Sequence, residues 1–169
     1  MVLNIMEYLQ VFDKNRNVLN EKVDRKNKYN LPLDKYFMIV LIFIENDEGC
    51  FLMQKTSKSK HSCIAVTGGH VTFGDTGIET VVKEVKEELG MDLLPNNINF
   101  VDATIYKNCH LEIYYTKNNV DIESLVLQES EVEYVKWYSI DEIYEFIRNN
   151  EFREANIEPF NRILEYINK

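Results

Sequence analysis

The chain has 169 residues, of which 45% are hydrophobic and 28% are charged, as in an ordinary globular protein of one domain. Its formal net charge of -9 argues against nucleic-acid and anionic-membrane partners, because an acidic surface repels phosphate groups. A small phosphorylated ligand stays possible, since a bound divalent cation reverses the local charge. We expect a single domain over residues 1–169, as a monomer or a homodimer.

The features that direct proteins to other compartments are missing. Residues 1–12 lack the basic and apolar regions of a secretory signal, and the longest apolar run, residues 36–44, is too short to span a bilayer. Cys50, Cys63 and Cys109 are odd in number and lack metal-type spacing, which favours free thiols in a reducing compartment. The sequence therefore predicts a cytoplasmic protein.

Hydrophobic patterns and turn residues predict two hairpins and a short strand in the first half of the chain. The strands are expected at residues 7–12, 18–24, 36–45, 50–55 and 63–67. Polar turns at residues 13–17 and 46–49 join the first two pairs, and Gly68 and Gly69 form a turn after the last strand.

The second half mixes strands and helices. Segments of β type are expected near residues 98–106, 110–116 and 132–138. Ser139 and Glu142 have the spacing of a capping box for a short helix, and a last helix is expected near residues 154–168, with Pro159 close to its first turn. Together the elements indicate an α/β or α+β sandwich.

The most informative stretch is GGHVTFGDTGIETVVKEVKEELGM, residues 68–91. Thr76 and Glu79 predict a capping box at the start of a helix, and Gly90 stands where a left-handed C-terminal cap is needed. At the helical period, one face carries Ile78, Val81, Val82, Val85 and Leu89. This face must pack against a sheet.

Glu84, Glu87 and Glu88 share a sector of this helix beside the apolar face. Like charges four residues apart destabilise a helix by about 0.2–0.5 kcal/mol, and a hard divalent cation would turn the repulsion into a binding site. A solvated acidic face is the ordinary alternative. The adjacent glycine pair, the capped start and the neighbouring apolar stripe favour the metal site.

This stretch resembles the Nudix box, G-x(5)-E-x(7)-R-E-U-x-E-E-x-G-U, in which U is aliphatic. The matching residues are Gly69, Glu84, Val85, Glu87, Glu88, Gly90 and Met91. Asp75 replaces the first Glu of the box and Lys83 replaces its Arg. These two replacements keep the charges, but a lysine cannot form the forked hydrogen bonds of an arginine. Weakened activity and compensation by a neighbouring residue are both open.

The resemblance implies a Nudix-type α/β/α sandwich with a mixed central sheet and an N-terminal β-hairpin. It implies Mg²⁺ or Mn²⁺ bound by Glu84, Glu87 and Glu88, with main-chain carbonyls near Gly68 and Gly69 completing the ligands. Asp75 and Lys83 would hold the loop and the helix together. About residues 7–147 are covered, and the N-terminal hairpin is similar to that of the isopentenyl-diphosphate-isomerase-like branch.

The implied reaction is the attack of water on a phosphorus of a diphosphate linkage, in a nucleoside diphosphate linked to another moiety or a similar small molecule. Glu112 is the first candidate for a general base outside the box, followed by Glu129 and Glu131. For each of the three, an ordinary surface carboxylate is at least as good an interpretation. The substrate itself is not readable from the sequence.

Two other functions are open. The resemblance extends to an isomerase that uses a Cys directly before a Gly-His pair together with a Glu, for which Glu112 is the match. Here Gly69 and His70 form the pair, but Gly68 precedes it and Cys63 is five residues upstream, which disfavours isomerisation. A catalytically silent binding domain is the third hypothesis, and the intact carboxylates argue against it.

The remaining candidates carry weaker signals. His70 adjoins the phosphate-facing loop, where contact with substrate and a structural hydrogen bond are equally plausible. His61 and His110 lack metal spacing and are expected on the surface or in the core. Trp137 is expected in the core rather than as a base-stacking ring.

Overall fold

The computed structural model describes residues 5–169. Residues 1–4, which begin the segment predicted to carry no secretory signal, lie outside the described part. The strands are β1 (Tyr8–Phe12), β2 (Val18–Asp24), β3 (Phe37–Glu45), β4 (Phe51–Thr56), β5 (Ile64–Ala65), β6 (Thr67–His70), β7 (Asn99–Tyr106), β8 (Cys109–Lys117) and β9 (Val132–Tyr138). The α-helices are α1 (Gly77–Leu89), α2 (Ile140–Arg148) and α3 (Ile157–Ile167).

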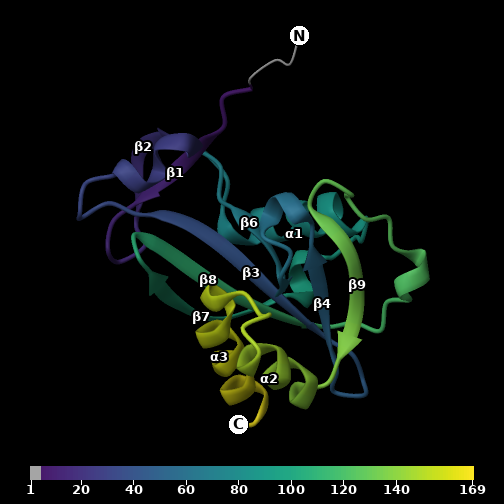
Figure 1. Cartoon of the computed structure of the whole chain (residues 1–169). Coiled ribbons are helices and arrows are strands. Elements are labelled where there is room, and N and C mark those ends of the chain that lie inside the picture. Colours follow the sequence, from purple (N-terminus) through teal and green to yellow (C-terminus); the bar gives the residue numbers. More distant parts are fainter. Residues whose placement is uncertain (1–4) are drawn as a thin grey trace.

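Strands β1 and β2 form the predicted N-terminal hairpin as a separate two-stranded antiparallel sheet. The hairpin is attached to the rest of the domain by single bridges from Leu9 to Thr72 and from Phe12 to Tyr36. A short 3-10 helix, η1 (Arg25–Asn30), follows β2 directly. Figure 1 shows this N-terminal unit at one end of the molecule, close to β6.

The central sheet has the order β5-β4-β3-β8-β7, with β6 beside β3 and β9 beside β4. Strands β3 and β8 run parallel over their whole length, from Phe37 opposite Cys109 to Glu45 opposite Lys117. The other strand pairs are antiparallel. The sheet is therefore mixed, as expected from the sequence.

Two local expectations for the first half of the chain need correction. The predicted second hairpin is present, but β3 and β4 pair only at Glu45 and Phe51, because β6 occupies the rest of that edge of β3 and β5 lies along the same edge of β4. Gly68 and Gly69 lie inside β6, opposite Leu41 and Val40, and form no turn. The connection to α1 is made by the residues after His70.

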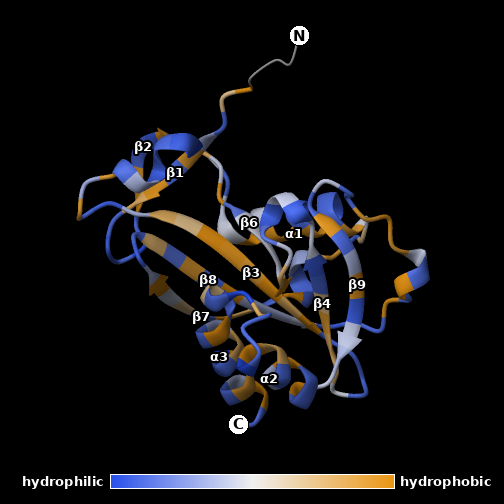
Figure 2. Ribbon diagram, viewed as in Figure 1, coloured by the Kyte–Doolittle hydropathy of each residue, from blue (hydrophilic) through white to orange (hydrophobic). Residues whose placement is uncertain are grey.

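The two faces of β3 bury two separate hydrophobic clusters, since successive side chains of a strand point to opposite sides. Phe37, Leu41 and Phe43 belong to the cluster that also contains residues of α2 and α3. Val40 and Ile42 belong to the cluster that contains residues of α1. Figure 2 shows β3 as a nearly continuous hydrophobic strand, as expected of a strand covered on both faces. This is the predicted three-layer sandwich.

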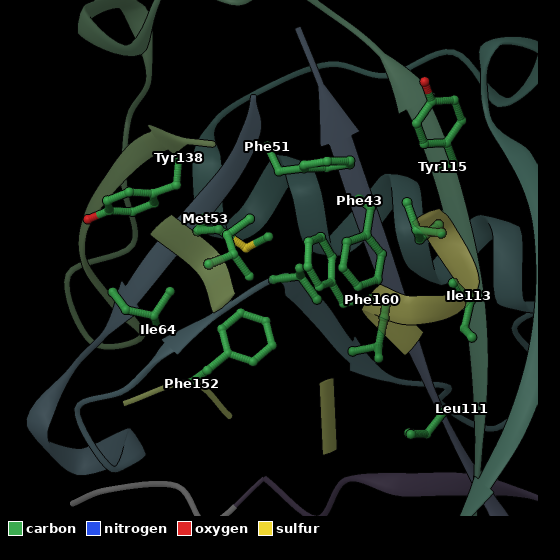
Figure 3. Close-up of a cluster of buried hydrophobic side chains, with 14 of the residues drawn as sticks. Phe43, Phe51, Met53, Ile64, Leu111, Ile113, Tyr115, Tyr138, Phe152 and Phe160 are labelled. Atoms are coloured by element: carbon green, nitrogen blue, oxygen red, sulfur yellow. The ribbon is translucent and has the colours of Figure 1, made fainter. Parts of the chain in front are cut away.

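Aromatic rings dominate the cluster under α2 and α3 (Figure 3). Phe160 of α3 stacks on Phe43 with ring centroids 6.1 Å apart and meets the edge of Phe51 at 5.6 Å. Phe152 packs against Phe160 at 6.3 Å, so the chain between α2 and α3 is fixed to the same core. These contacts anchor the C-terminal helices to the sheet.

The helix signals were largely confirmed. Thr76 and Glu79 form a capping box at the start of α1, and Gly90 ends it with a left-handed φ of 66°. A second capping box, between Ser139 and Glu142, starts α2. In α3, Pro159 lies in the first turn. Over residues 5–169, no helix has both the length and the apolar character required to cross a bilayer.

Candidate active site

The acidic sector of α1 lies at the border between the buried and the solvent-exposed side of the helix. Glu88 is 6% exposed, Glu84 is half-buried and Glu87 is exposed. Val85 and Leu89, on the apolar face, are fully buried against β3. The amphipathic pattern therefore presses two of the three carboxylates toward the sheet and leaves the third in solvent.

Gly69 is required where it stands, because Glu84 occupies the space that a side chain would need. A Cβ atom at Gly69 would lie 2.2 Å from Cδ of Glu84. At Gly68, on the other face of β6, a Cβ atom would lie 2.2 Å from the carbonyl oxygen of Val40. The glycine pair thus allows β6 to approach both β3 and the box helix.

Negative charge is unfavourable on the carboxyl groups of Glu84 and Glu88. Burial, and then the charge of Glu87, raise the pKa of Glu84 from 4.5 to about 7. Burial, and then the charge of Glu84, raise the pKa of Glu88 from 4.5 to about 8. A positive ion beside them would reverse both effects.

One carboxylate oxygen of Glu88 lacks a hydrogen-bond partner, although a hydrogen bond with the Gln54 side chain lowers the pKa of Glu88. Its Oε2 atom is buried and accepts no hydrogen bond from the protein within residues 5–169. The neighbouring Gln54 is buried and accepts a hydrogen bond of 3.2 Å from Thr67 through Oε1. Among the same residues, no three His, Cys, Asp or Glu side chains already converge on one point suited to a metal ion.

Asp75 and Lys83, the two replacements in the box, form a weak contact. Lys83 Nζ is 4.0 Å from Asp75 Oδ2, and both side chains are well exposed. Asp75 Oδ2 instead accepts a hydrogen bond of 2.6 Å from Thr72 Oγ1 within the loop. The predicted connection between loop and helix is present only as this long ion pair.

Glu112 lies under the first turn of α1. Its Oε1 accepts a hydrogen bond of 2.8 Å from Arg16, and its Oε2 accepts one of 2.6 Å from the Tyr114 hydroxyl. The carboxylate is close to Gly77, and the seven residues from there to Glu84 advance the helix by about 10 Å. Both oxygens are thus engaged away from the acidic sector, and the role of general base for Glu112 stays a prediction.

The segment with Glu129 and Glu131 lies against the other end of α1. Gln128 donates its backbone N–H to the carbonyl of Glu88 over 2.9 Å, which satisfies a terminal carbonyl of the helix. Glu131 forms an ion pair of 3.3 Å with Lys60, and its charge contributes to the raised pKa of Glu88. Glu129 is exposed. Of the three predicted bases, Glu131 acts most directly on an inward carboxyl group of the box.

A family model described as NUDIX domain matches residues 35–160, which is most of the chain. The chain belongs to the Nudix family. This membership supports hydrolysis of a pyrophosphate-type bond, and Nudix hydrolases generally use divalent metal ions. The matched region contains most of both hydrophobic clusters and the whole of α1, the helix of the Nudix box.

Nudix relatives in two bacteria match most of the chain. The chain is 29% identical to an uncharacterized Nudix hydrolase of Clostridium acetobutylicum over 157 residues, which covers 85% of this chain and 75% of the relative. It is 24% identical to a second uncharacterized Nudix hydrolase, from Listeria innocua, over 151 residues, covering 87% and 88% of the two chains. Neither name states a substrate.

Solved structures confirm the fold. A protein of Deinococcus radiodurans superposes with a TM-score of 0.73 at 15% identity, covering 89% of this chain and 94% of that chain. A MutT structure, from a study of the Aliivibrio salmonicida and Vibrio cholerae proteins, gives 0.62 at 17% identity, covering 77% and 98%. An Ap4A hydrolase of Caenorhabditis elegans gives 0.57 at 14% identity, covering 76% and 97%. At these identities the likeness concerns the Nudix fold alone.

The histidines are distributed as expected from the sequence, with one addition. His110 is buried, and its Nε2 lies 2.8 Å from the carbonyl oxygen of Asp13, whereas His61 is exposed. His70 of the Nudix box lies 2.7 Å from Lys28 Nζ. Sequence reasoning missed Lys28, although Arg25, Lys26 and Lys28 form a basic run in a chain of net charge -9.

Proposed function

We propose that the protein hydrolyses a diphosphate linkage in a small molecule, with Mg²⁺ or Mn²⁺ bound by Glu84, Glu87 and Glu88. The observation that carries the proposal is the buried Glu88 Oε2 atom, which has no hydrogen-bond partner among residues 5–169. An unsatisfied buried carboxylate oxygen is unfavourable unless a ligand completes it. Glu84, one turn away on the same helix, faces the same kind of environment.

The donor set fits a hard divalent cation. Carboxylate oxygens and main-chain carbonyls are the ligands that Mg²⁺ and Mn²⁺ prefer, and Glu84, Glu87, Glu88 and the Gly68 carbonyl can supply them. Glu87 is exposed, so it can turn toward an ion as the ion binds. When bound, the ion would neutralise phosphate charge and lower the pKa of a coordinated water.

The chain itself orients the reaction. The Gly69 position lets Glu84 lie directly against β6, and the capped start of α1 fixes the helix relative to that strand. The main-chain bond from Gln128 holds the loop with Glu131 beside the box. We propose that Glu112, Glu129 or Glu131 accepts a proton from the attacking water. Of these, Glu131 lies on the segment that is hydrogen-bonded to the end of α1 through Gln128.

We infer the substrate class from the family. A diphosphate linkage in a nucleoside diphosphate joined to another moiety, or in a similar small molecule, fits the box. One structural relative is an Ap4A hydrolase and another is a MutT protein, so nucleotides belong in the first panel of compounds.

The isomerase alternative is not favoured by the geometry. Cys63 lies before β5, and its Sγ is 3.6 Å from the Thr56 hydroxyl, on the β4–β5 connection. Gly68 stands where the isomerase cysteine would precede the Gly-His pair. A silent binding domain would not require two desolvated carboxylates, and both alternatives are decided by the same assay.

The test is hydrolysis of a panel of diphosphate compounds with Mg²⁺, including isopentenyl diphosphate, with product masses determined. Glu88→Gln should lose at least a hundredfold in kcat/KM. Glu145→Gln, the same substitution at an exposed position of α2, should retain wild-type activity. Isomerised product without phosphate release would contradict hydrolysis, and equal activity of the two variants would remove Glu88 from the site.

A further inference from the structure

A second polar site adjoins β6, the strand that precedes α1, on the side of the N-terminal unit formed by β1, β2 and η1. A cavity of about 320 Å³ lies between the segment before β1 and the end of β2 with η1. Arg25, Lys26 and Lys28 line it, together with the acidic residues Glu7 and Asp24. Figure 1 shows this part of the chain close to β6. Three cations around one cavity are unexpected in a protein of net charge -9.

Lys28 is held in place by four neighbours. Its Nζ lies 2.7 Å from Nε2 of His70 and about equally far from the rings of Tyr29 and Phe37, at 5.0 and 5.1 Å from their centroids. Asn108 donates a hydrogen bond of 2.9 Å to the Lys28 carbonyl. An ammonium group only donates, so His70 Nε2 is the acceptor and the imidazole is neutral.

Within the part of the chain that the structure describes, the ammonium group of Lys28 forms no ion pair. None of the ion pairs found within residues 5–169 includes Lys28. The two acids of the cavity are engaged elsewhere, because Glu7 pairs with Arg25 at 2.7 Å and Asp24 accepts from the backbone of Lys26. Burial, and then the charge of Arg25, lower the pKa of Lys28. A half-buried cation that forms no ion pair with the acids around it is suited to an anion.

The cationic group lies next to the acidic sector across one strand. His70 follows Gly69, and neighbouring residues of a strand face opposite sides, so Glu84 lies at one face of β6 and Lys28 at the other. The charge of Arg25 acts on both sides, since it contributes to the pKa values of Glu84 and His70. Within the described residues, β6 forms ladder pairs only with β3, and β1 bridges to Thr72 just beyond its end.

We propose that Lys28, held against His70 and assisted by Arg25, forms an anion subsite that binds a phosphoryl group of the substrate. The inference rests on the proposed function, because it assigns the second end of the same diphosphate. An ordered ammonium on the other face of β6 supplies binding energy and direction, while the carboxylates of α1 serve the attacked phosphorus. Lys28 is thus a substrate-binding residue contributed by the N-terminal unit.

Titration calorimetry of the full chain with inorganic diphosphate and a chelator tests the subsite without hydrolysis. Lys28→Met keeps most of the side-chain stem and removes the charge. Lys136→Met removes the same charge from an exposed position of β9. We expect diphosphate affinity to fall at least tenfold for Lys28→Met and less than twofold for Lys136→Met. In the wild type, the imidazole NMR signals of His70 should shift as diphosphate binds. This measurement does not depend on the folding of any variant.

Equal affinities of the two variants, with unchanged His70 signals in the wild type, would overturn the subsite and leave Lys28 as a structural residue. Hydrolysis is measured separately, so the two proposals fail separately. If the wild type hydrolyses a compound but Lys28→Met binds diphosphate as well as the wild type does, only the subsite is rejected. Diphosphate binding that depends on Lys28, in a protein that cleaves no compound, would support the subsite and reject the hydrolase.

Discussion

Replacing Glu88 by Gln is expected to stabilise the metal-free protein at alkaline pH. The rise of the Glu88 pKa from 4.5 to about 8 means that the folded protein is more stable with Glu88 protonated than with Glu88 ionised. The difference in the free energy of unfolding is roughly 5 kcal/mol, at about 1.4 kcal/mol per pKa unit. Because the folded-state pKa is the higher one, this stability is complete below pH 4.5 and is lost as the pH rises through about 8. Roughly half of the loss falls above pH 6, and local relaxation reduces it, so we expect about 2 kcal/mol between pH 6 and pH 9.

Urea denaturation with a chelator present measures this difference at the two pH values. The wild type should lose about 2 kcal/mol more than Glu88→Gln between them, and the exposed control Glu145→Gln should behave as the wild type. Adding Mg²⁺ at the higher pH should restore stability to the wild type and much less to Glu88→Gln. Identical pH dependence of the wild type and Glu88→Gln would refute the reasoning that Glu88 is desolvated without a partner.

Three other substitutions test the packing around the site. Gly69→Ala should lower kcat/KM at least tenfold, because its Cβ would lie 2.2 Å from Glu84 Cδ; unchanged activity would show that Glu84 is free to move. Phe160→Ala, at a fully buried position, should lower the free energy of unfolding by about 3–5 kcal/mol in urea, and a loss below about 1 kcal/mol would contradict the described core. Lys83→Met should change that energy by less than about 0.5 kcal/mol, because the Lys83–Asp75 pair is long and exposed; a larger loss would mean that the pair holds the loop.

The sequence predicted the box helix well because its signals are local. A capping box depends on two residues of the same turn, and a left-handed cap depends on one glycine, so Thr76, Glu79 and Gly90 were sufficient to place α1. The helical period then assigned the buried face and the acidic sector beside it. Burial of Glu88 and exposure of Glu87 follow from the same period once a sheet covers the apolar face.

The remaining features depend on contacts between residues far apart in the chain. Nothing local distinguishes a Gly-Gly turn from a Gly-Gly strand; the approach of Val40 and Glu84 decides it in β6. The separation of β3 from β4 arises because β6 competes for the same edge. Likewise, the contact between Lys28 and His70 spans 42 residues, and only the folded arrangement of η1 against β6 brings it about.

The central claim, that water attacks a diphosphate phosphorus at the Glu84–Glu88 carboxylates, is tested most directly by cleavage in ¹⁸O-labelled water. The best compound of the panel would be incubated with Mg²⁺ and the phosphate-bearing products analysed by mass spectrometry and ³¹P NMR. We predict that the wild type incorporates one solvent oxygen into one phosphate-bearing product, and that Glu88→Gln or a chelator abolishes this. A wild type that forms no labelled product from any compound, or that isomerises a diphosphate without taking up solvent oxygen into phosphate, would contradict the account.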